Sequence, residues 1–289
     1  MNPMRFEFAT TGRILFGSGT AKEIPDIARS LGRRALLVTH RSFTHLDPAV
    51  THPLRGSAIA TFEISGEPDF DRVRSGTEIG RAARCDHVVA IGGGSTIDAA
   101  KAIAMLLANG SDPLDHAEVI GAGRPITRPS LPWIAAPTTA GAGAEATRNA
   151  VLRSTEHRVK VSLRSPFMLP TVAVVDPDLT RDLPPSVTST TGLDALSQVL
   201  EPFVSRKATP LTDALCREGL SLIGRSLLRS VARSMRPMEP SAQPSSPLSW
   251  RPTSLTRTIA YAQDTPRSLD SSPDAMKRVL KTVSPGSVP

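Results

Sequence analysis

The sequence predicts an α/β protein: a doubly wound, mostly parallel sheet domain, then an incomplete all-helical domain, then a disordered tail. Short apolar, β-branched runs alternate with longer segments of helical period up to about residue 180. Strands and helices that alternate in this way form parallel sheets joined by right-handed crossovers. After Asp176-Pro177 only helical period continues, and the end of the chain is rich in Pro and Ser. We therefore expect three parts, residues 1–180, 181–234 and 235–289.

Five runs predict buried strands, because they are short and apolar and contain β-branched residues. They are residues 35–39 (ALLVT), 58–64 (AIATFEI), 87–91 (HVVAI), 133–136 (WIAA) and 172–175 (VAVV). The segments of helical period between them are residues 20–31, 70–84 and 96–108. Farther along, residues 186–204 and 212–234 carry apolar side chains three and four apart, which indicates the opening of an all-helical domain.

The last part of the chain predicts disorder. From Met235 onward it contains nine Pro and ten Ser in 55 residues, so it has little apolar surface to offset the entropy of ordering. Only residues 272–283 combine an N-cap with a modest amphipathic pattern. Two explanations stay open: a natural flexible tail, or a tail foreign to the fold, as a shifted reading frame would produce. The second is favoured, because the helical domain needs more helices to cover its apolar faces.

Composition narrows the class of protein. The formal charge of +7 comes from scattered Lys and Arg, often next to acids, so we expect no nucleic-acid partner. No run of 18 apolar residues occurs and the start lacks a secretory signal, so we expect no membrane partner and a cytoplasmic location. Cys85 and Cys216 make neither a disulfide framework nor a metal-ligand spacing.

The strongest motif is a glycine-rich turn formed by Gly92, Gly93, Gly94 and Ser95, directly after the strand HVVAI and before a helix. Glycines let the backbone approach a ligand closely, and the helix start offers unpaired N–H groups that suit a pyrophosphate. The alternative is a tight strand-to-helix turn with no ligand. In the same helix Asp98 and Lys101 are three residues apart, which favours a simple local ion pair.

A second motif begins with Thr138 and Thr139 at the end of the strand WIAA and continues with small residues. Open α/β sheets bind ligands at the carboxyl edge of their strands, which makes this a candidate polar loop at a ligand site. The alternative is a connecting loop capped by threonine. Lys160, in the alternating run RVKVSL, either reaches a cofactor or points into water.

Several strings together resemble the iron-containing (group III) alcohol dehydrogenase family. They are GGGSTIDAAKAIA, LPWIAAPTTAGAGAEATRNAVL, HRVKVSLRSPFMLPTVAVVDPDLT and TGLDALSQVLEPFVSRKATPLTDALC, with TTGRILFGSGT similar to the family's opening strand and turn. The resemblance runs from about residue 6 to about residue 230. It implies a dehydroquinate synthase-like arrangement, in which an α/β cofactor domain precedes a helical metal domain. A sugar-phosphate cyclase or polyol-phosphate dehydrogenase resembles the chain less well.

The resemblance implies that the chain binds NAD or NADP. The positions that match the family's cofactor contacts are Gly92, Gly93, Gly94, Ser95, Thr138, Thr139 and Lys160. At the end of the strand ALLVT, where many relatives place an acidic or small residue near the adenosine ribose, this chain has His40. NAD is favoured because no arginine clamp for the extra phosphate is evident, with Arg41 as the one reservation.

The resemblance also implies a divalent metal, iron or zinc, held in intact relatives by one Asp and three His. Asp194 matches the aspartate, and the first histidine position, four residues later, is Gln198. Gln offers a neutral oxygen, a weaker transition-metal ligand than imidazole. The histidines are His40, His45, His52, His87, His116 and His157, so none follows Asp194. We therefore expect no metal to be bound here.

The implied activity is NAD(P)-dependent oxidation of small alcohols, or reduction of aldehydes and ketones, by hydride transfer. The metal of an intact relative would act as the Lewis acid, and in this chain no catalytic residue can be named. One alternative is a catalytically silent nucleotide-binding fragment of the family. Another is an interaction protein that uses its basic Ser/Pro tail. Relatives often form dimers, so a homodimer is expected.

Overall fold

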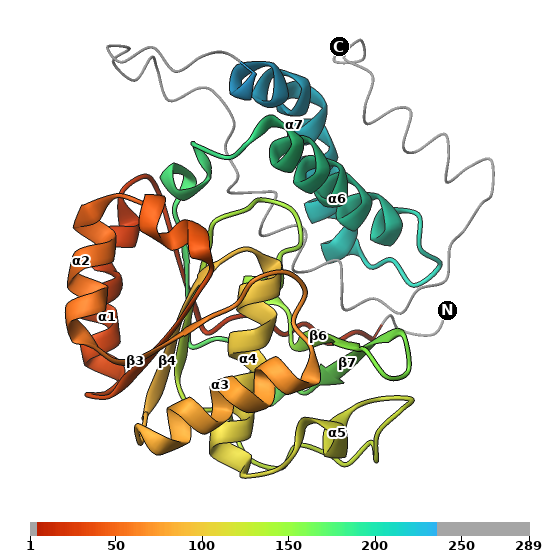
Figure 1. The fold of residues 1–289 in the computed structure, drawn as a ribbon. Coiled ribbons are helices and arrows are strands. Elements are labelled where there is room, and N and C mark those ends of the chain that lie inside the picture. The colour runs from red at the N-terminus through yellow and green to blue at the C-terminus, as the bar shows by residue number, and fades with distance from the viewer. Residues whose placement is uncertain (1–4, 236–289) are drawn as a thin grey trace, which may run out of the picture. The chain divides into compact units, whose positions relative to one another are not determined.

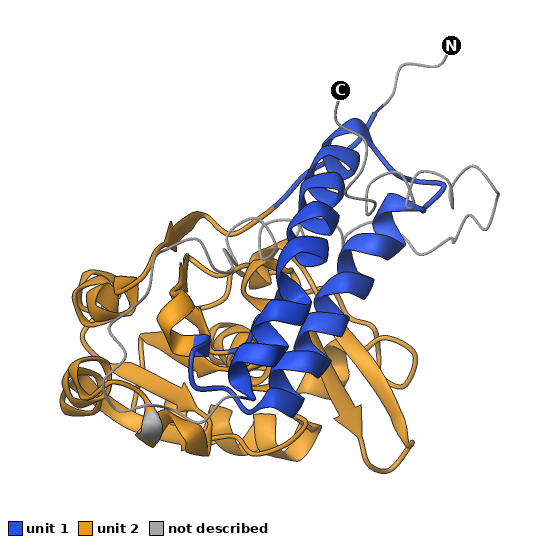
Figure 2. Ribbon diagram, turned by 90° about the horizontal axis from the view of Figure 1, so that it is seen from above, with its two compact units in different colours: residues 1–9, 139–143, 180–289 blue, residues 10–138, 144–179 orange. Residues whose placement is uncertain are grey.

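The structure, a computed structural model, describes residues 5–235 of the chain. The tail beyond Met235, with the helix expected at residues 272–283, lies outside the described residues. The chain divides into two compact units, shown in Figure 2. One comprises Thr10–Thr138 and Ala144–Leu179 and is called here the α/β unit. The other, called the helical unit, comprises among the described residues 5–9, Thr139–Gly143 and 180–235.

A six-stranded, fully parallel sheet forms the centre of the α/β unit, in the order β1-β8-β5-β4-β2-β3. The strands are β1 (Arg13–Phe16), β2 (Ala35–Thr39), β3 (Ala58–Glu63), β4 (His87–Gly92), β5 (Trp133–Pro137) and β8 (Val172–Val175). The chain runs from β2 outward to β3 and then returns to β4 on the other side of β2. The doubly wound sheet expected from the sequence is therefore confirmed, with its reversal of direction between β2 and β4.

Helices cover both faces of this sheet, which explains why β2, β4, β5 and β8 are buried along their whole length. Successive side chains of a strand point to opposite faces, so Leu36 and Val88 pack into one core and Leu37 and Val89 into the other. The covering helices are α1 (Ile24–Leu31) and α2 (Pro48–Ser57) on one face, and α3 (Phe70–Ala82) and α4 (Gly94–Asn109) on the opposite face (Figure 1).

Several elements of the α/β unit were not expected from the sequence. An antiparallel hairpin, β6 (Asn149–Ser154) and β7 (Val159–Arg164), forms a separate two-stranded sheet. The helix α2 was missed because it contains Pro53 and a low share of good helix formers, and its formation rests on the burial of Val50 and Leu54. The short helix α5 (Pro113–His116) was missed as well.

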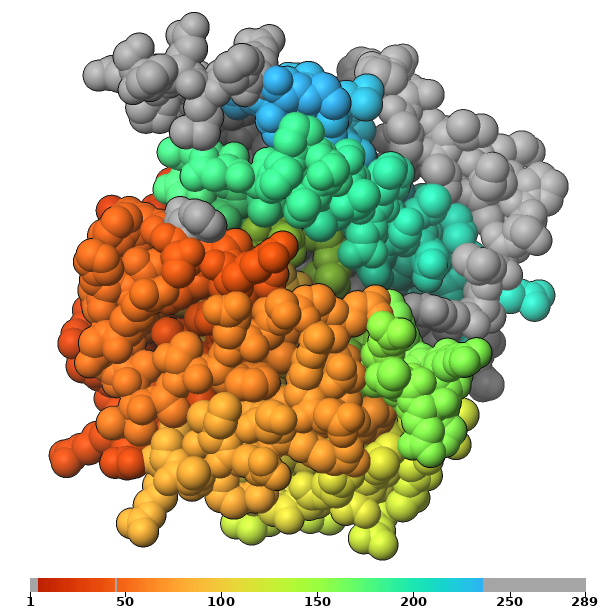
Figure 3. Space-filling model, in the orientation of Figure 1, coloured from red at the N-terminus to blue at the C-terminus, as the bar shows by residue number. Residues whose placement is uncertain are grey.

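Short 3₁₀ turns complete the unit: η1 (Thr20–Glu23), η2 (Arg41–His45), η3 (Ala144–Ala146), η4 (Pro166–Met168) and η5 (Pro177–Thr180). The single helix expected over residues 20–31 is divided into η1 and α1, because Pro25 lies in the first turn of α1, where a missing N–H costs nothing. The hairpin lies against the segment before α3 (Figure 3). The Arg153 N–H donates to the Pro68 carbonyl at 2.8 Å.

The helical unit contains α6 (Pro185–Phe203) and α7 (Pro210–Ser234), close to the two helices expected from the sequence. A capping box between Thr209 and Thr212 begins α7. The buried residues that join the two helices are Ala195, Val199, Phe203, Cys216, Leu220 and Ile223. Within the described part of the chain, no helix is both long enough and apolar enough to cross a lipid bilayer.

Candidate functional site

The carboxyl ends of three neighbouring strands meet at one edge of the sheet. Thr39 of β2 is paired with Ile91 of β4, and Gly92 of β4 is paired with Pro137 of β5. His40, the glycine turn and Thr138 therefore follow these strands at the same level of the sheet. The reversal of strand order between β2 and β4 makes this edge a topological switch point, where open α/β sheets form ligand crevices.

The glycine turn joins β4 to α4 with no intervening loop. Gly93 is the N-cap residue and makes no side-chain capping bond, and the first turn of the helix holds no acidic residue. Among the described residues, none accepts a hydrogen bond from the N–H of Gly94, Ser95 or Thr96. The helix has 16 residues, so the positive end of its dipole and these N–H groups are directed at the sheet edge without a protein anion to balance them.

The first glycine of the turn is required by packing alone. A Cβ on Gly92 would lie 2.5 Å from the Thr96 Oγ1, because the helix turns back over the strand end. The carbonyl of Gly92 accepts a hydrogen bond from the Thr138 N–H at 3.0 Å, which ties the second motif to the first. Packing therefore explains Gly92 as part of a tight turn, but it does not explain why the N–H groups of the next residues lack acceptors among the described residues.

The two threonines of the second motif fall in different units. Thr138 belongs to the α/β unit and is buried, and its hydroxyl has no hydrogen-bond partner among the described residues. Thr139 is half-buried and belongs to the helical unit. In that unit the loop passes close to α6, since a Cβ on Gly141 would lie 2.6 Å from the Thr191 carbonyl oxygen.

His40 lies at the expected edge but is engaged locally. Its Nδ1 accepts a hydrogen bond from the Ser42 N–H at 3.2 Å and so caps η2. Lys160 lies on β7, in the separate hairpin, and its ammonium pairs with the Glu67 carboxylate. The structure thus brings together Gly92 to Ser95, Thr138 and His40 at one sheet edge, and Lys160 is not part of that edge.

The two metal-site residues expected from the sequence lie on one face of α6. The Gln198 amide nitrogen donates to the Asp194 carboxylate at 3.3 Å. Among the described residues, no group of three His, Cys, Asp or Glu side chains could hold a metal ion. Two oxygen donors do not make a transition-metal site, so these residues do not fit an iron or zinc centre by themselves.

A buried charged cluster was missed by sequence reasoning. The ion pair expected between Asp98 and Lys101 is present, with 3.7 Å between the Lys101 Nζ and the Asp98 Oδ1, but Lys101 is completely buried. Burial lowers the pKa of Lys101 and raises the pKa of Asp98. Burial also raises the pKa of Glu145 to about 7. The spacing of three residues predicts an ion pair but does not distinguish a pair on the surface from a buried one. The alanine-rich composition of α4 could have predicted the burial of this helix, because it fits a helix covered on all sides.

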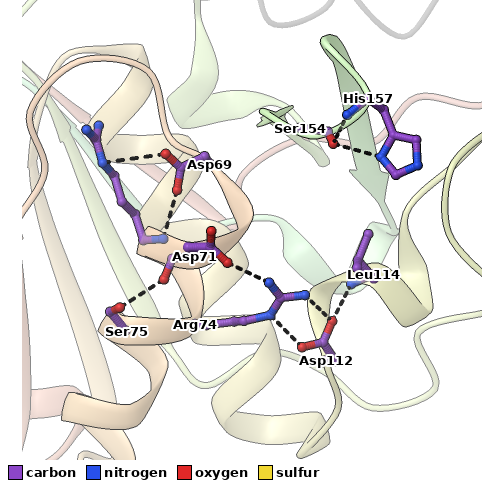
Figure 4. Close-up of polar contacts among 9 residues, drawn as sticks. Asp69, Asp71, Arg74, Ser75, Asp112, Leu114, Ser154 and His157 are labelled. Atoms are coloured by element: carbon purple, nitrogen blue, oxygen red, sulfur yellow. Dashed lines mark hydrogen bonds and ion pairs between the residues drawn. The ribbon is translucent and has the colours of Figure 1, made fainter.

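A second polar cluster joins α3 to α5 and has a structural role (Figure 4). The Arg74 guanidinium makes a two-pronged contact with the Asp112 carboxylate, at 2.7 and 2.9 Å, and donates to Asp71 at 2.7 Å. Hydrogen bonding to Arg74 lowers the pKa of Asp112. Asp112 also caps α5 through the Leu114 N–H, so every member of this cluster has a structural partner.

Comparison with known proteins gives two family matches. The model of the iron-containing alcohol dehydrogenase family matches residues 11–177, and the model of the family's C-terminal part matches residues 188–236. The chain is 35% identical over 224 residues to the NAD-dependent methanol dehydrogenase of Bacillus methanolicus, covering 75% of this chain and 58% of that protein. It is 34% identical over 240 residues to the 1,3-propanediol dehydrogenase of Klebsiella pneumoniae, covering 80% of this chain and 61% of that protein.

Solved structures give the same result. The sulfoacetaldehyde reductase of Bifidobacterium kashiwanohense in complex with NAD+ superposes with a TM-score of 0.75 at 30% identity, covering 90% of this chain and 66% of that one. A 1,3-propanediol oxidoreductase superposes with a TM-score of 0.73 at 30% identity, covering 90% and 64%. The chain spans 58% and 61% of the length of the two curated relatives named above.

Proposed function

Because the chain belongs to the iron-containing alcohol dehydrogenase family, we propose that its α/β unit binds a nicotinamide dinucleotide through the glycine turn that begins α4. The observation that carries the proposal is the set of N–H groups of Gly94, Ser95 and Thr96, which lack acceptors among the described residues. They stand at the positive end of a long helix, at a topological switch point. A diphosphate is the anion that such a turn suits.

The neighbouring side chains extend this proposal. The hydroxyls of Ser95 and Thr138 are donors close to the turn, and Thr138 is fixed there by its bond to the Gly92 carbonyl. His40, in register with the turn, is proposed to lie near the adenosine ribose. Thr139 and Lys160 are proposed as cofactor contacts on the family resemblance alone, because Thr139 belongs to the helical unit and Lys160 lies on the separate hairpin. We propose NAD as the preferred cofactor over NADP, with Arg41 as the one side chain that an extra phosphate could use.

The reaction proposed for the whole protein is hydride transfer between a small alcohol or aldehyde and the nicotinamide. The dinucleotide supplies the hydride chemistry, and the protein residues bind and orient it. Asp194 and Gln198 are the residues proposed to face a metal in the helical unit. They do not complete a site among the described residues, so no catalytic step is derived through a metal.

A second candidate function is dinucleotide binding without turnover. The observation that favours it is the pair of oxygen donors in α6, Asp194 and Gln198, in place of a full ligand set. This candidate shares the glycine turn with the first and differs from it only in the reaction.

We also propose the domain boundaries 1–180 and 181–234, a cytoplasmic location and a homodimer. Light scattering coupled to size-exclusion chromatography checks the homodimer.

One experiment tests the proposal and separates the two candidates. NAD and NADP are titrated into the full chain by calorimetry, and reduced cofactor is then followed by absorbance with methanol or 1,3-propanediol, with added Fe²⁺ or Zn²⁺. Binding with turnover supports the dehydrogenase, and binding without turnover supports the silent nucleotide-binding protein. Absence of binding to either dinucleotide contradicts both.

A further inference from the structure

The ammonium of Lys101 joins α4 to the segment that follows the Thr138 loop. Its Nζ donates to the carbonyl of Ala144 at 2.8 Å, to the hydroxyl of Thr147 at 2.9 Å and to the carbonyl of Asn149 at 2.7 Å. An ammonium has three N–H donors, so all of them are used on this one segment. The side chain has no exposed surface. Lys101 therefore links the helix that begins at the glycine turn with residues 144–149.

Two carboxyl groups accompany this cation. Asp98 lies one helical turn before Lys101 and accepts a hydrogen bond from the Val151 N–H at 3.1 Å, so it holds the start of β6. Glu145 is only 3% exposed and lies within the segment that Lys101 binds. The Thr11 hydroxyl donates to the Glu145 carbonyl at 2.7 Å, which fixes its backbone. Among the described residues, Lys101 and Asp98 of α4 are the charged groups that act on Glu145.

The charges of the cluster balance when one of its two carboxyl groups is protonated, and Asp98 is the carboxylate that pairs with Lys101. With Glu145 protonated, one ammonium faces one carboxylate and the buried group is neutral. With Glu145 ionised, a second carboxylate shares the same cation, whose three donors are already used. An extra buried negative charge is costly unless it reaches a partner or water. Ionisation of Glu145 therefore favours movement of the segment that carries it.

We propose that Lys101, Asp98 and Glu145 form a buried positioning cluster that fixes residues 144–149 against α4, and that the charge on Glu145 sets how firmly the segment is held. Both arms of the candidate site depend on this cluster. The glycine turn begins the helix that carries Asp98 and Lys101, and residues 144–149 follow Thr138 in the chain after the segment Thr139–Gly143. The consequence for dinucleotide affinity rests on the proposed function, whereas the consequence for the segment itself does not.

The raised pKa of Glu145, about 7, places the change near neutral pH. Below that pH the cluster is neutral and the segment is held. Above it the segment loosens and the added negative charge also opposes an anionic ligand. One ionising group changes such an equilibrium by at most about tenfold per pH unit, which bounds the expected effect.

The test uses hydrogen exchange of the full chain at pH 6 and pH 8, corrected for the intrinsic pH dependence of exchange. The Val151 amide is the reporter, because its acceptor is Asp98. We expect its protection to fall several-fold, and at most about tenfold, from pH 6 to pH 8. In Glu145→Gln, protection should be equal at both pH values. The matched control, Glu156→Gln on the exposed turn of the hairpin, should keep the pH dependence of the parent protein.

A titration of the parent chain tests the proposal without any substitution. The ¹³C shift of the Glu145 carboxyl in the parent chain should titrate with a midpoint near 7. A midpoint near its ordinary 4.5 overturns the proposal, and so does a pH-dependent protection that survives in Glu145→Gln.

Dinucleotide binding is measured on the same samples. NAD affinity should weaken several-fold from pH 6 to pH 8 in the parent chain and stay constant in Glu145→Gln. An affinity that changes equally in both proteins contradicts the coupling. If no sample binds NAD at either pH, the proposed function fails, and the exchange and carboxyl titrations still decide whether the cluster acts as proposed.

Discussion

The α/β unit and the helical unit differ in what each supplies to a functional site. In the α/β unit, helices cover both faces of the sheet, and the groups of the candidate site follow its own strand ends. In the helical unit, two helices share a small core, Leu193 and Leu228 are 56% and 82% exposed, and two oxygen donors lie on α6. The difference is instructive, because an anion site can be built from the backbone of one strand-helix turn, whereas a transition-metal site needs side chains from several elements.

The largest expected effect tests the difference in packing. Ile103 of α4 has no exposed surface, and its replacement by Ala should lower the free energy of unfolding by about 2–5 kcal/mol. The matched change Ile223→Ala in α7, in the smaller core, should cost less because its surroundings can collapse more easily. Urea unfolding measures both values. Equal or reversed costs would remove the contrast between the two units.

The next effect is the pH dependence of stability in the α/β unit. The folded state holds the Glu145 proton more tightly than the unfolded chain, with a pKa of about 7 against an ordinary 4.5. The stabilisation is therefore complete below about pH 4.5 and is lost as the pH rises through 7. The raised pKa of Glu145 corresponds to about 3 kcal/mol of folding stability below pH 4.5.

Thermal unfolding of the parent protein and of Glu145→Gln between pH 5 and pH 8 measures this loss. The difference between the two proteins isolates Glu145 from other carboxyl groups. A difference that does not change with pH would show that Glu145 is not the titrating group.

In the α/β unit, the strands of the central sheet were predicted better than the strands of the separate hairpin. The runs at residues 35–39 and 172–175 coincide with β2 and β8, because a strand buried on both faces is apolar throughout. The hairpin was not predicted, although the run RVKVSL alternates as a half-buried strand does. In β7, Val161 and Leu163 are buried, whereas Lys160 and Arg164 are exposed.

Some parts of the candidate site were also predicted from the sequence and others were not. The glycine turn was found because glycine and helix starts constrain the backbone locally. The surroundings of Lys101 depend on residues 43 to 48 positions away in the chain, which no spacing rule reveals. His40 was placed at the sheet edge by its strand, but its bond to Ser42 was not foreseen.

A smaller effect is expected in the glycine turn itself. Gly93→Val places a branched side chain at the N-cap, where a ligand would approach the N–H groups of Gly94 and Ser95. Loss of a hydrogen bond to a charged group costs about 1.5–3 kcal/mol, which predicts NAD binding weaker by roughly tenfold to a hundredfold. The control is Gly56→Val at the end of α2, where an added Cβ meets nothing within 4 Å. Equal affinities of the two variants would contradict the assignment.

The smallest effect is expected at Thr138. Thr138→Val removes a hydroxyl that has no partner among the described residues, so stability should change little. NAD affinity should fall by about 1 kcal/mol, or roughly fivefold, as for the loss of one neutral hydrogen bond. Thr138→Ser keeps the hydroxyl and should retain the parent affinity. A calorimetric titration in which the serine variant is the weaker binder would assign Thr138 to packing.

The N–H groups at the start of α4 are proposed to bind the diphosphate of a nicotinamide dinucleotide. The most direct measurement is an NMR titration of the isotope-labelled full chain with NAD, following the amide resonances of Gly94, Ser95 and Thr96. We expect these resonances to shift saturably, and pyrophosphate to move the same amides. Resonances that stay in place while NAD saturates the protein elsewhere, or a chain that does not bind NAD, would contradict the claim.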